Sequence, residues 1–530
     1  MPIMSGFNET AGRPDGSVAS PIRRVLQNFG FAALLSILFL TFLDNTVISA
    51  VLANVQSELH SGVSDLQWVV GGYALAFASL MLICGSLGDN YGRKKIMLIG
   101  VTVFCAGSIV SALSTSSTEL IIGRMIMGAG AAASEPGTLS MIRHIYPDSR
   151  RRARALGAWA AVSGLALAMG PVLGGVLVGI WTWRAVFWFN LVFGGLAFVA
   201  ASIGLPESAD PTRRRPDFFG FALGALAVGS ATYATIAGES AGYFASWVLT
   251  LYGVSIVFLI AFLIVEGRIS NPMLELGFFK RPAFAGATFV ALASYFSILS
   301  IVFFVALYLE VIASAGAYQL AQDFLPLLGG MVAASLFTGR WVAAVGSRVP
   351  MMVGCLVAAT GVFFTNVFIA PDAGLTTVGW TMGIAGIGFG ILVVPVTSTA
   401  LTSLPAANSG MAASMTNTSR ELGAVAGVAI LGSIVNGQLT VQLTRRLAEI
   451  GIPPAYRSEV ITAVTTGTIG SQMKGLSGHT SAEVQKIIDK VVPAAYQAFT
   501  HGLNLALSAS FVLLLLSAMV AYVTGTSEHG

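Results

Sequence analysis

The chain reads GSLGDNYGRKK from Gly85 to Lys95. Two long apolar stretches, 68–88 and 96–114, flank this segment, so it predicts a short basic loop between two helices. Gly92 suits a tight turn, and Gly85 lets a neighbouring helix approach closely. Asp89 and Arg93 can form a charge pair at a helix end. The simpler alternative is a loop whose charges only orient the chain in a membrane.

The chain as a whole is far more apolar than a water-soluble domain. Of its 530 residues, 55% are hydrophobic and 10% are charged, whereas soluble domains carry about 25% charged residues. The net charge of +4 gives no indication of a nucleic-acid partner. The three cysteines lie within apolar stretches without the spacing of a disulfide or metal site, and no phosphate-binding Gly-x4-Gly-Lys-Ser/Thr run occurs. We therefore expect no cofactor, no metal, no bound nucleotide and no enzymatic activity.

Fourteen apolar stretches are long enough to span a bilayer, which takes about 20 residues. They occupy 29–55, 68–88, 96–114, 118–142, 155–179, 185–204, 219–238, 247–266, 284–309, 319–338, 350–370, 376–400, 410–436 and 500–524. The chain is thus predicted to be an all-α polytopic membrane protein. Lys and Arg residues gather in alternate short loops, and this bias predicts that both termini are cytoplasmic.

The spans also predict a domain organisation. An N-terminal tail precedes a six-helix bundle, and a linker with two extra transmembrane helices leads to a second six-helix bundle and a short tail. The predicted bounds are 1–28 for the first tail, 29–204 for the first bundle, 205–283 for the linker, 284–524 for the second bundle and 525–530 for the last tail. The second bundle contains a long outer loop, 437–499, whose apolar spacing predicts short amphipathic helices.

Asp44 lies in the middle of the first span, and a carboxylate at that depth costs roughly 2.5–3.5 kcal/mol. Such a group is a candidate for carrying a proton or attracting a cation. Arg124, in the fourth span, lies at a similar depth in the outer half of the bilayer, so the two side chains can pair. We predict that Asp44 takes up a proton and that Arg124 tunes this uptake. A static ion pair is the alternative.

Four further candidates lie in the fourth and thirteenth spans. Glu135 shares a helix face with Arg124 but lies deeper, so it is either a second proton site or a partner of Arg93. Asn417, Arg420 and Glu421 can form one polar patch, because they are three and four residues apart. This patch serves either local charge neutralisation or, alternatively, coupling or cation binding.

Several motifs resemble those of one transporter family. The Gly85–Lys94 segment matches Gly-x-Leu-x-Asp-x-x-Gly-Arg-Lys, the signature loop of the major facilitator superfamily. A degenerate echo, from Gly339 to Arg348 without the Asp, indicates an internal repeat. The fifth span resembles the family's antiporter signature, with Ala166 in place of one glycine. Its matching residues are Gly157, Gly170, Pro171, Gly174 and Gly175.

Three more segments narrow the resemblance to the fourteen-helix drug:proton antiporter branch. Leu43–Val47 is similar to Leu-Asp-x-Thr-Val, and Asn417–Gly423 is similar to Asn-Thr-x-Arg-x-x-Gly. Arg124–Gly128 resembles Arg-x-x-Gln-Gly, with Met127 in place of the glutamine. The resemblance implies two six-helix bundles plus two central helices, with a cytoplasmic latch of Gly85, Asp89, Gly92 and Arg93 that breaks when the bundles rock.

The resemblance also implies a function. It is proton-coupled export of amphipathic, in part cationic, drugs or toxic compounds by alternating access in the cell membrane. Asp44, Glu135 and Glu421 would be the proton sites, with Arg124, Arg420 and Asn417 as their partners. The expected partners are protons, a small amphipathic substrate and the bilayer. The alternatives are a dedicated exporter of an endogenous lipid, siderophore or antibiotic, and a non-transporting sensor or assembly factor that uses loop 437–499 as a partner surface.

Overall fold

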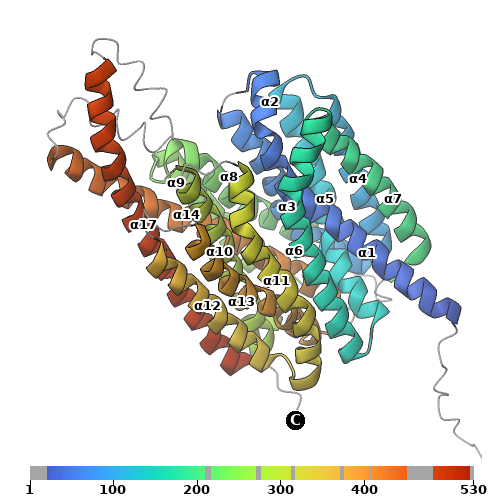
Figure 1. The fold of residues 1–530 in the computed structure, drawn as a ribbon. Coiled ribbons are helices and arrows are strands. Elements are labelled where there is room, and N and C mark those ends of the chain that lie inside the picture. Colours follow the sequence, from blue (N-terminus) through green and yellow to red (C-terminus); the bar gives the residue numbers. More distant parts are fainter. Residues whose placement is uncertain are drawn as a thin grey trace, which may run out of the picture.

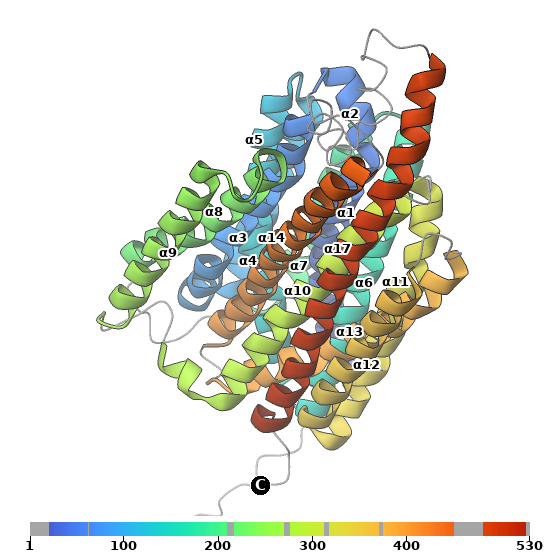
Figure 2. The same ribbon diagram turned by 90° about the vertical axis from the view of Figure 1, so that its left-hand side faces the viewer.

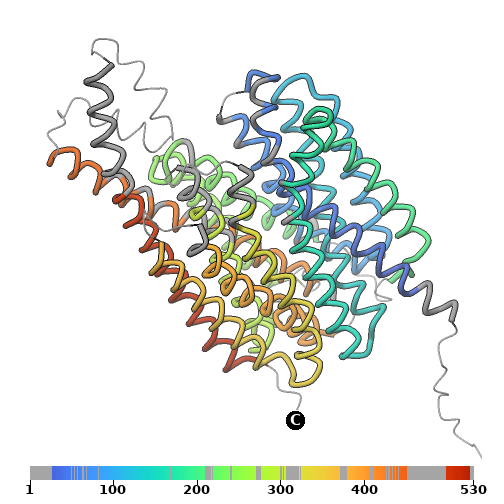
Figure 3. The backbone as a smooth tube through the Cα atoms, viewed as in Figure 1, coloured from blue at the N-terminus to red at the C-terminus, as the bar shows by residue number. Residues whose placement is uncertain are grey.

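The computed structural model is helical throughout the residues that it describes, and no strand occurs among them. This confirms the predicted all-α class, and the path of the backbone is followed in Figure 3. The described residues are 21–61, 63–208, 217–269, 276–311, 317–369, 375–405, 408–449 and 481–525.

The first half of the chain, blue to cyan-green in Figure 1, forms one helical bundle. Its elements are α1 (Pro21–Val47), the 3-10 turn η1 (Ile48–Val51), α2 (Leu52–Leu59), α3 (Val63–Tyr91), α4 (Arg93–Leu113), α5 (Ser117–Ile145), α6 (Ser149–Ile180) and α7 (Ala185–Gly204). We call this bundle the N half.

The second half forms a matching bundle, which we call the C half. Its elements are η2 (Leu276–Lys280), α10 (Pro282–Val311), α11 (Ala317–Val345), α12 (Arg348–Phe368), α13 (Leu375–Thr402), α14 (Ser409–Glu449) and α17 (Ser481–Thr524). Between the halves in sequence come α8 (Phe218–Ala241) and α9 (Ser246–Glu266), which pack on each other. This pair lies at the side of the molecule, where α8 contacts α3 and α14 (Figure 2).

The two halves repeat one packing pattern. In the N half α4 packs on α5 and α7, and in the C half α12 packs on α13 and α17. Likewise α1 packs on α6 and α7, as α10 does on α14 and α17. The contacts between the halves follow the same rule, because α3 packs on α14 and α6 packs on α11. This symmetry supports the internal repeat that the sequence echo indicates.

Two glycines mark the same turn in each half. Gly92 joins α3 to α4 with a φ of 112°, and Gly346 joins α11 to α12 with a φ of 77°. Side chains with a Cβ atom rarely adopt this region, so both sharp reversals need glycine. The echo after α11 therefore keeps the backbone of the signature loop although it lacks the aspartate.

Helix lengths and exposed surfaces fit a membrane. Among the described residues, nine helices are long and apolar enough to cross a bilayer, or up to eleven with the bent helices α3 and α6. On α9, large apolar side chains such as Ile256, Val257 and Ile260 are exposed, as expected of a helix that faces lipid. The count of fourteen spans stays a prediction.

Two expectations about helix ends are wrong. The first predicted span, 29–55, is broken, because α1 ends at Val47 and α2 starts at Leu52 after a 3-10 turn. Residues 437–449 and 481–499 do not form separate short helices, since they extend α14 and α17 beyond the bundle (Figure 2). The pattern of Val484, Ile487, Ile488 and Val491 thus belongs to a long helix, and 450–480 lies outside the described residues.

The first and last described helices place the two ends of the chain at the same end of the bundle. The start of α1 and the end of α17 are found at the lower end in Figure 1, and α2 is found at the upper end. We call the lower end, where Gly92 joins α3 to α4, the latch end.

Candidate functional site

Asp44 and Arg124 form a buried ion pair within the N half. The guanidinium of Arg124, on α5, donates to the carboxylate of Asp44, on α1, at 2.5 Å. Their side chains are 1% and 0% exposed. The sequence predicted this contact from depth alone, and the structure brings the two residues together.

Other groups complete the shell of this pair, which we call the N cluster. Asn190 of α7 donates its amide to the second Asp44 oxygen at 2.6 Å. Arg124 also donates to the carbonyl of Val69 at 3.1 Å and lies over the ring of Tyr73, 4.5 Å from its centre. Asp44 is therefore enclosed by groups of the N half in this conformation.

Glu135 faces the C half instead of the N cluster. Asn417, on α14, donates its amide to the carboxylate of Glu135, on α5, at 3.3 Å. Glu421 lies close enough for its charge to act on Glu135. Arg93, the alternative partner predicted from sequence, instead binds Asp89 and Ser208. The carboxyl group thus lies on the surface between the two halves.

Arg420 continues this contact into the C half. Its guanidinium donates to the side-chain amide oxygen of Asn417 at 3.0 Å and to the Thr397 hydroxyl at 2.6 Å. The same group lies near the rings of Trp159 in the N half and Tyr295 in the C half, at 5.8 and 5.5 Å. We call Glu135, Asn417, Arg420 and Glu421 the central cluster.

A small cavity adjoins the central cluster. It has room for about one water molecule, and Arg420 contributes to its wall. Most of the remaining wall is apolar, and its other lining residues are Ser294, Tyr295, Ile298, Met331, Phe389, Leu392, Val393 and Val396. This volume is far below that of a ligand pocket, so the cavity holds no drug-sized molecule in this conformation. Among the described residues, no group of three or more His, Cys, Asp or Glu could hold a metal ion.

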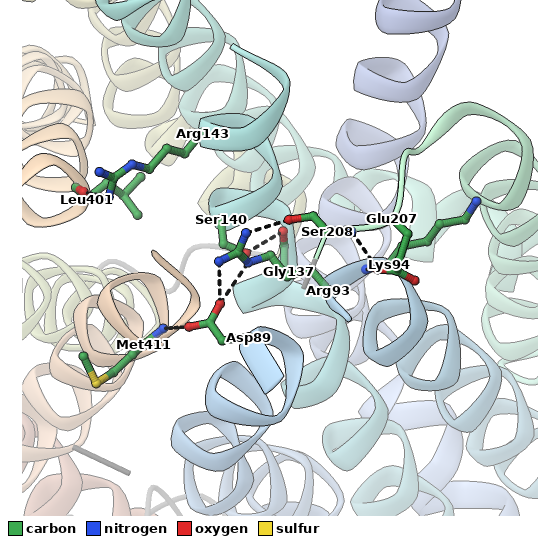
Figure 4. Close-up of polar contacts among 10 residues, drawn as sticks. All are labelled: Asp89, Arg93, Lys94, Gly137, Ser140, Arg143, Glu207, Ser208, Leu401 and Met411. Carbon is green, nitrogen blue, oxygen red and sulfur yellow. Dashed lines mark hydrogen bonds and ion pairs between the residues drawn. The ribbon is translucent and has the colours of Figure 1, made fainter. Parts of the chain in front are cut away.

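The latch residues are joined as the sequence predicted, and they also reach the C half. Arg93 binds the Asp89 carboxylate at 2.7 and 2.9 Å and donates to the Ser208 hydroxyl at 2.7 Å (Figure 4). The other Asp89 oxygen accepts from the backbone N–H of Met411 at 2.8 Å. Met411 is in the first turn of α14, so a carboxylate from the N half lies at the positive end of a C-half helix.

The glycine-rich helix α6 follows its predicted pattern in part. It bends by 43° between Ser149–Leu167 and Val172–Ile180, where Gly170 and Pro171 lie. A Cβ atom on Gly170 would overlap Thr46 of α1, and one on Gly157 would press on the Ser335 carbonyl of α11. Gly174 is buried. Gly175 is exposed, and a Cβ atom there would meet nothing, so it takes no part in close packing in this conformation.

Sequence reasoning missed several partners. Asn190 could have been found, because an amide in an otherwise apolar span is costly and usually functional. Trp159, Thr397 and Ser208 carry no such pattern. Arg143 looks in the sequence like one more basic loop residue, although its guanidinium contacts the carbonyls of Leu401 and Leu404 in the C half.

Comparison with known proteins decides the family. A family model described as Major Facilitator Superfamily matches residues 34–428. The chain belongs to the major facilitator superfamily. The resemblance inferred from the motifs is thereby confirmed, and the protein is a multi-pass membrane transporter and not an enzyme.

Two relatives and one solved structure extend this result. The chain is 31% identical over 490 residues to "Drug efflux pump JefA" of Mycobacterium tuberculosis, which covers 90% of this chain and 94% of that protein. It is 32% identical over 398 residues to "Methylenomycin A resistance protein" of Bacillus subtilis, with 74% and 84% covered. The solved structure of the proton:xylose symporter XylE has a TM-score of 0.60, 12% identity and coverage of 95% and 97%. That structure supports the fold alone.

Proposed function

We propose that this protein exports amphipathic drugs or toxic compounds in exchange for protons, by alternating access with the latch end facing the cytoplasm. Its family and its similarity to a protein named as a drug efflux pump support export. The bias of Lys and Arg in the short loops supports the orientation.

One observation carries the proton part of the proposal. Glu135 lies in the N half, is 6% exposed, and accepts a hydrogen bond from Asn417 of the C half. A proton that binds there changes the charge on the surface where the halves meet. Since a transporter of this kind works by moving one half against the other, that charge can be coupled to the movement.

The groups around Glu135 support a coupled response. Arg420 and Glu421 act electrostatically on Glu135. The charges of Glu135 and Glu421 in turn act on the phenol groups of Tyr73 and Tyr295. Because Arg420 also lines the cavity, a change at Glu135 would be transmitted through Asn417 to a group that a substrate can touch. We propose Glu421 as a further station and Asp44 as a site that is reached after the N half opens.

The available driving force is sufficient for uphill export. Each unit of pH difference supplies about 1.4 kcal/mol per proton. The membrane potential adds about 2.3 kcal/mol per charge for each 100 mV. One proton per cycle can therefore sustain on the order of a hundred-fold gradient of a neutral compound.

The test uses the full chain in liposomes that hold a lipophilic fluorescent dye. An imposed pH gradient should accelerate dye efflux through the wild type, and Glu135→Gln should abolish this acceleration. Glu119→Gln is the matched control, because Glu119 is an exposed acid at the far end of the same helix. If Glu135→Gln still responds to the gradient as the wild type does, the role of Glu135 is wrong.

A second candidate function is export of one particular antibiotic. The similarity to a protein named for methylenomycin A resistance supports it. In the same liposomes, efflux of a single compound among many chemically diverse dyes and antibiotics would favour this narrower function. Efflux of several unrelated amphipathic compounds would exclude it.

A further inference from the structure

We propose that Arg143 is the second charge of a two-charge gate that closes the latch end. In this gate Asp89 and Arg143, both from the N half, bind the two ends of the segment that joins α13 to α14 in the C half. The inference builds on the alternating-access part of the proposed function, and it assigns a gating role to a residue outside the signature loop.

Arg143 lies in the last turn of α5 and reaches across to α13. Its guanidinium donates to the carbonyl of Leu401, which lies beside it in Figure 4. It also donates, at 2.9 Å, to the carbonyl of Leu404. The α13 helix ends at Thr402, so Leu401 lies in its last turn and Leu404 follows two residues after its end. Carbonyl groups at a helix end have no partner within the helix, and the end carries a partial negative charge. A cation is therefore the complementary group.

Asp89 makes the contact of opposite charge, with a backbone N–H that lies a few residues after Leu404 in the C half. Its carboxylate accepts from the N–H of Met411, in the first turn of α14, where the helix end is partially positive. The N half thus presents a cation to the end of one helix and an anion to the start of the next. Both contacts would be lost together if the halves separated at this end.

The charges around Arg143 make its hydrogen bonds to these carbonyls more important for a stable guanidinium. The positive charges of Arg93 and Arg152 both act on it. Opening the gate would leave the guanidinium facing two like charges without the α13 carbonyls. In the closed gate the two carbonyls are the hydrogen-bond acceptors of this half-buried guanidinium.

Close packing beside the gate shows that the halves meet tightly here. A Cβ atom on Gly339 of α11 would overlap the Ala153 carbonyl of α6. The Ser414 hydroxyl of α14 donates to the Met81 carbonyl of α3 at 2.6 Å. Arg143 and Asp89 thus act on a surface that is already complementary in shape.

The chain provides a matched control for the gate. Arg281, which directly precedes α10, donates to the Ser403 carbonyl at 2.6 Å, so it binds the same end of α13. It belongs to the C half, and its bond does not cross between the halves. Removal of Arg281 tests whether α13 merely needs a cation at its end.

The experiment measures distances by double electron–electron resonance in nanodiscs. Spin labels are placed at Lys95→Cys and Val349→Cys, exposed positions in the first turns of the symmetry-related helices α4 and α12. The background is the full chain with Cys84, Cys105 and Cys355 replaced by alanine. Because no substrate or proton gradient is used, failure here is distinguishable from failure of the proposed transport function.

Arg143→Met should raise the ratio of long to short distances about ten-fold, the effect typical of losing a charge-assisted hydrogen bond. Arg143→Lys, which keeps the charge but not the fork, should give a smaller rise, and Arg281→Met should leave the ratio within about two-fold. The proposal is overturned if Arg143→Met leaves the distances unchanged, or if Arg281→Met shifts them equally. Arg143→Lys also serves as the folded test should Arg143→Met fail to assemble.

Discussion

The two buried charge clusters contain similar side chains but lie in different mechanical settings. In the N cluster, Asp44 binds Arg124 and Asn190, and all three belong to one half. In the central cluster, Glu135 meets an amide and an arginine of the other half. A rigid rocking motion would remake the second cluster, whereas the first changes only when the N half itself opens. The comparison indicates that a carboxylate is a candidate coupling group because of where it lies relative to the moving surface.

The largest expected effect is on folding, from breaking the N cluster. Arg124→Leu leaves the Asp44 carboxylate buried without its cation, which costs about 3–5 kcal/mol. We expect this variant to unfold at clearly lower temperature or to fail to assemble, as measured by thermal melting in detergent. Asp44→Asn combined with Arg124→Gln should recover much of the loss, since no charge then stays unpaired. Equal stability of Arg124→Leu and the wild type would show that the pair is not structural.

The next largest effect distinguishes the two clusters by the same substitution, Asn to Leu, made once in each. Asn190→Leu and Asn417→Leu both remove an amide that donates to a buried acid. We expect Asn190→Leu to lower stability by about 1–3 kcal/mol while the proton-driven fraction of dye efflux is kept. Asn417→Leu should lower that fraction on the order of ten-fold, because it removes the bridge between Glu135 and Arg420. The comparison fails if the two variants exchange these phenotypes.

The smallest expected effect concerns Glu58, an acid in the last turn of α2, at the end of the bundle opposite the latch end. The Glu58 carboxylate accepts from Arg184 and from the Trp183 indole, and the Arg184 bond lowers the pKa of Glu58 below its ordinary value of 4.5. A lowered pKa means that this contact stabilises the fold above that value and is lost only at still more acidic pH. Glu58→Gln should therefore leave the pH dependence of dye efflux between pH 6 and pH 8 unchanged. A shifted profile would assign this surface acid a part in coupling.

The sequence contained most of the fold and part of the site. Apolar stretches and signature motifs predicted the helical class and the repeat, because both depend on local composition and on glycines such as Gly92 and Gly346. The pairing of Asp44 with Arg124 followed from equal depth in the bilayer. The lengths of α14 and α17 beyond the bilayer did not follow from a pattern based on membrane thickness. In the structure Leu443 and Leu447 of α14 share an apolar cluster with Ala498 and Phe499 of α17.

The contacts between the halves were the least predictable part. For Glu135 the sequence offered either a second proton site or a pair with Arg93. It did not indicate Asn417, which only the packing of α5 against α14 brings to the carboxylate. Arg143 was missed for a different reason. Its partners are backbone carbonyls, which every residue carries, so no side chain in the sequence marks the place that the guanidinium reaches.

The most direct measurement of the central claim counts the protons that move with each dye molecule, with a pH indicator enclosed in the liposomes. The account predicts at least about one proton moved against each dye molecule by the wild type. It predicts that Glu135→Gln carries dye only down its own gradient, with no accompanying protons. If Glu135→Gln instead moves protons and dye in the wild-type ratio, the carboxyl group between the halves is not the coupling site.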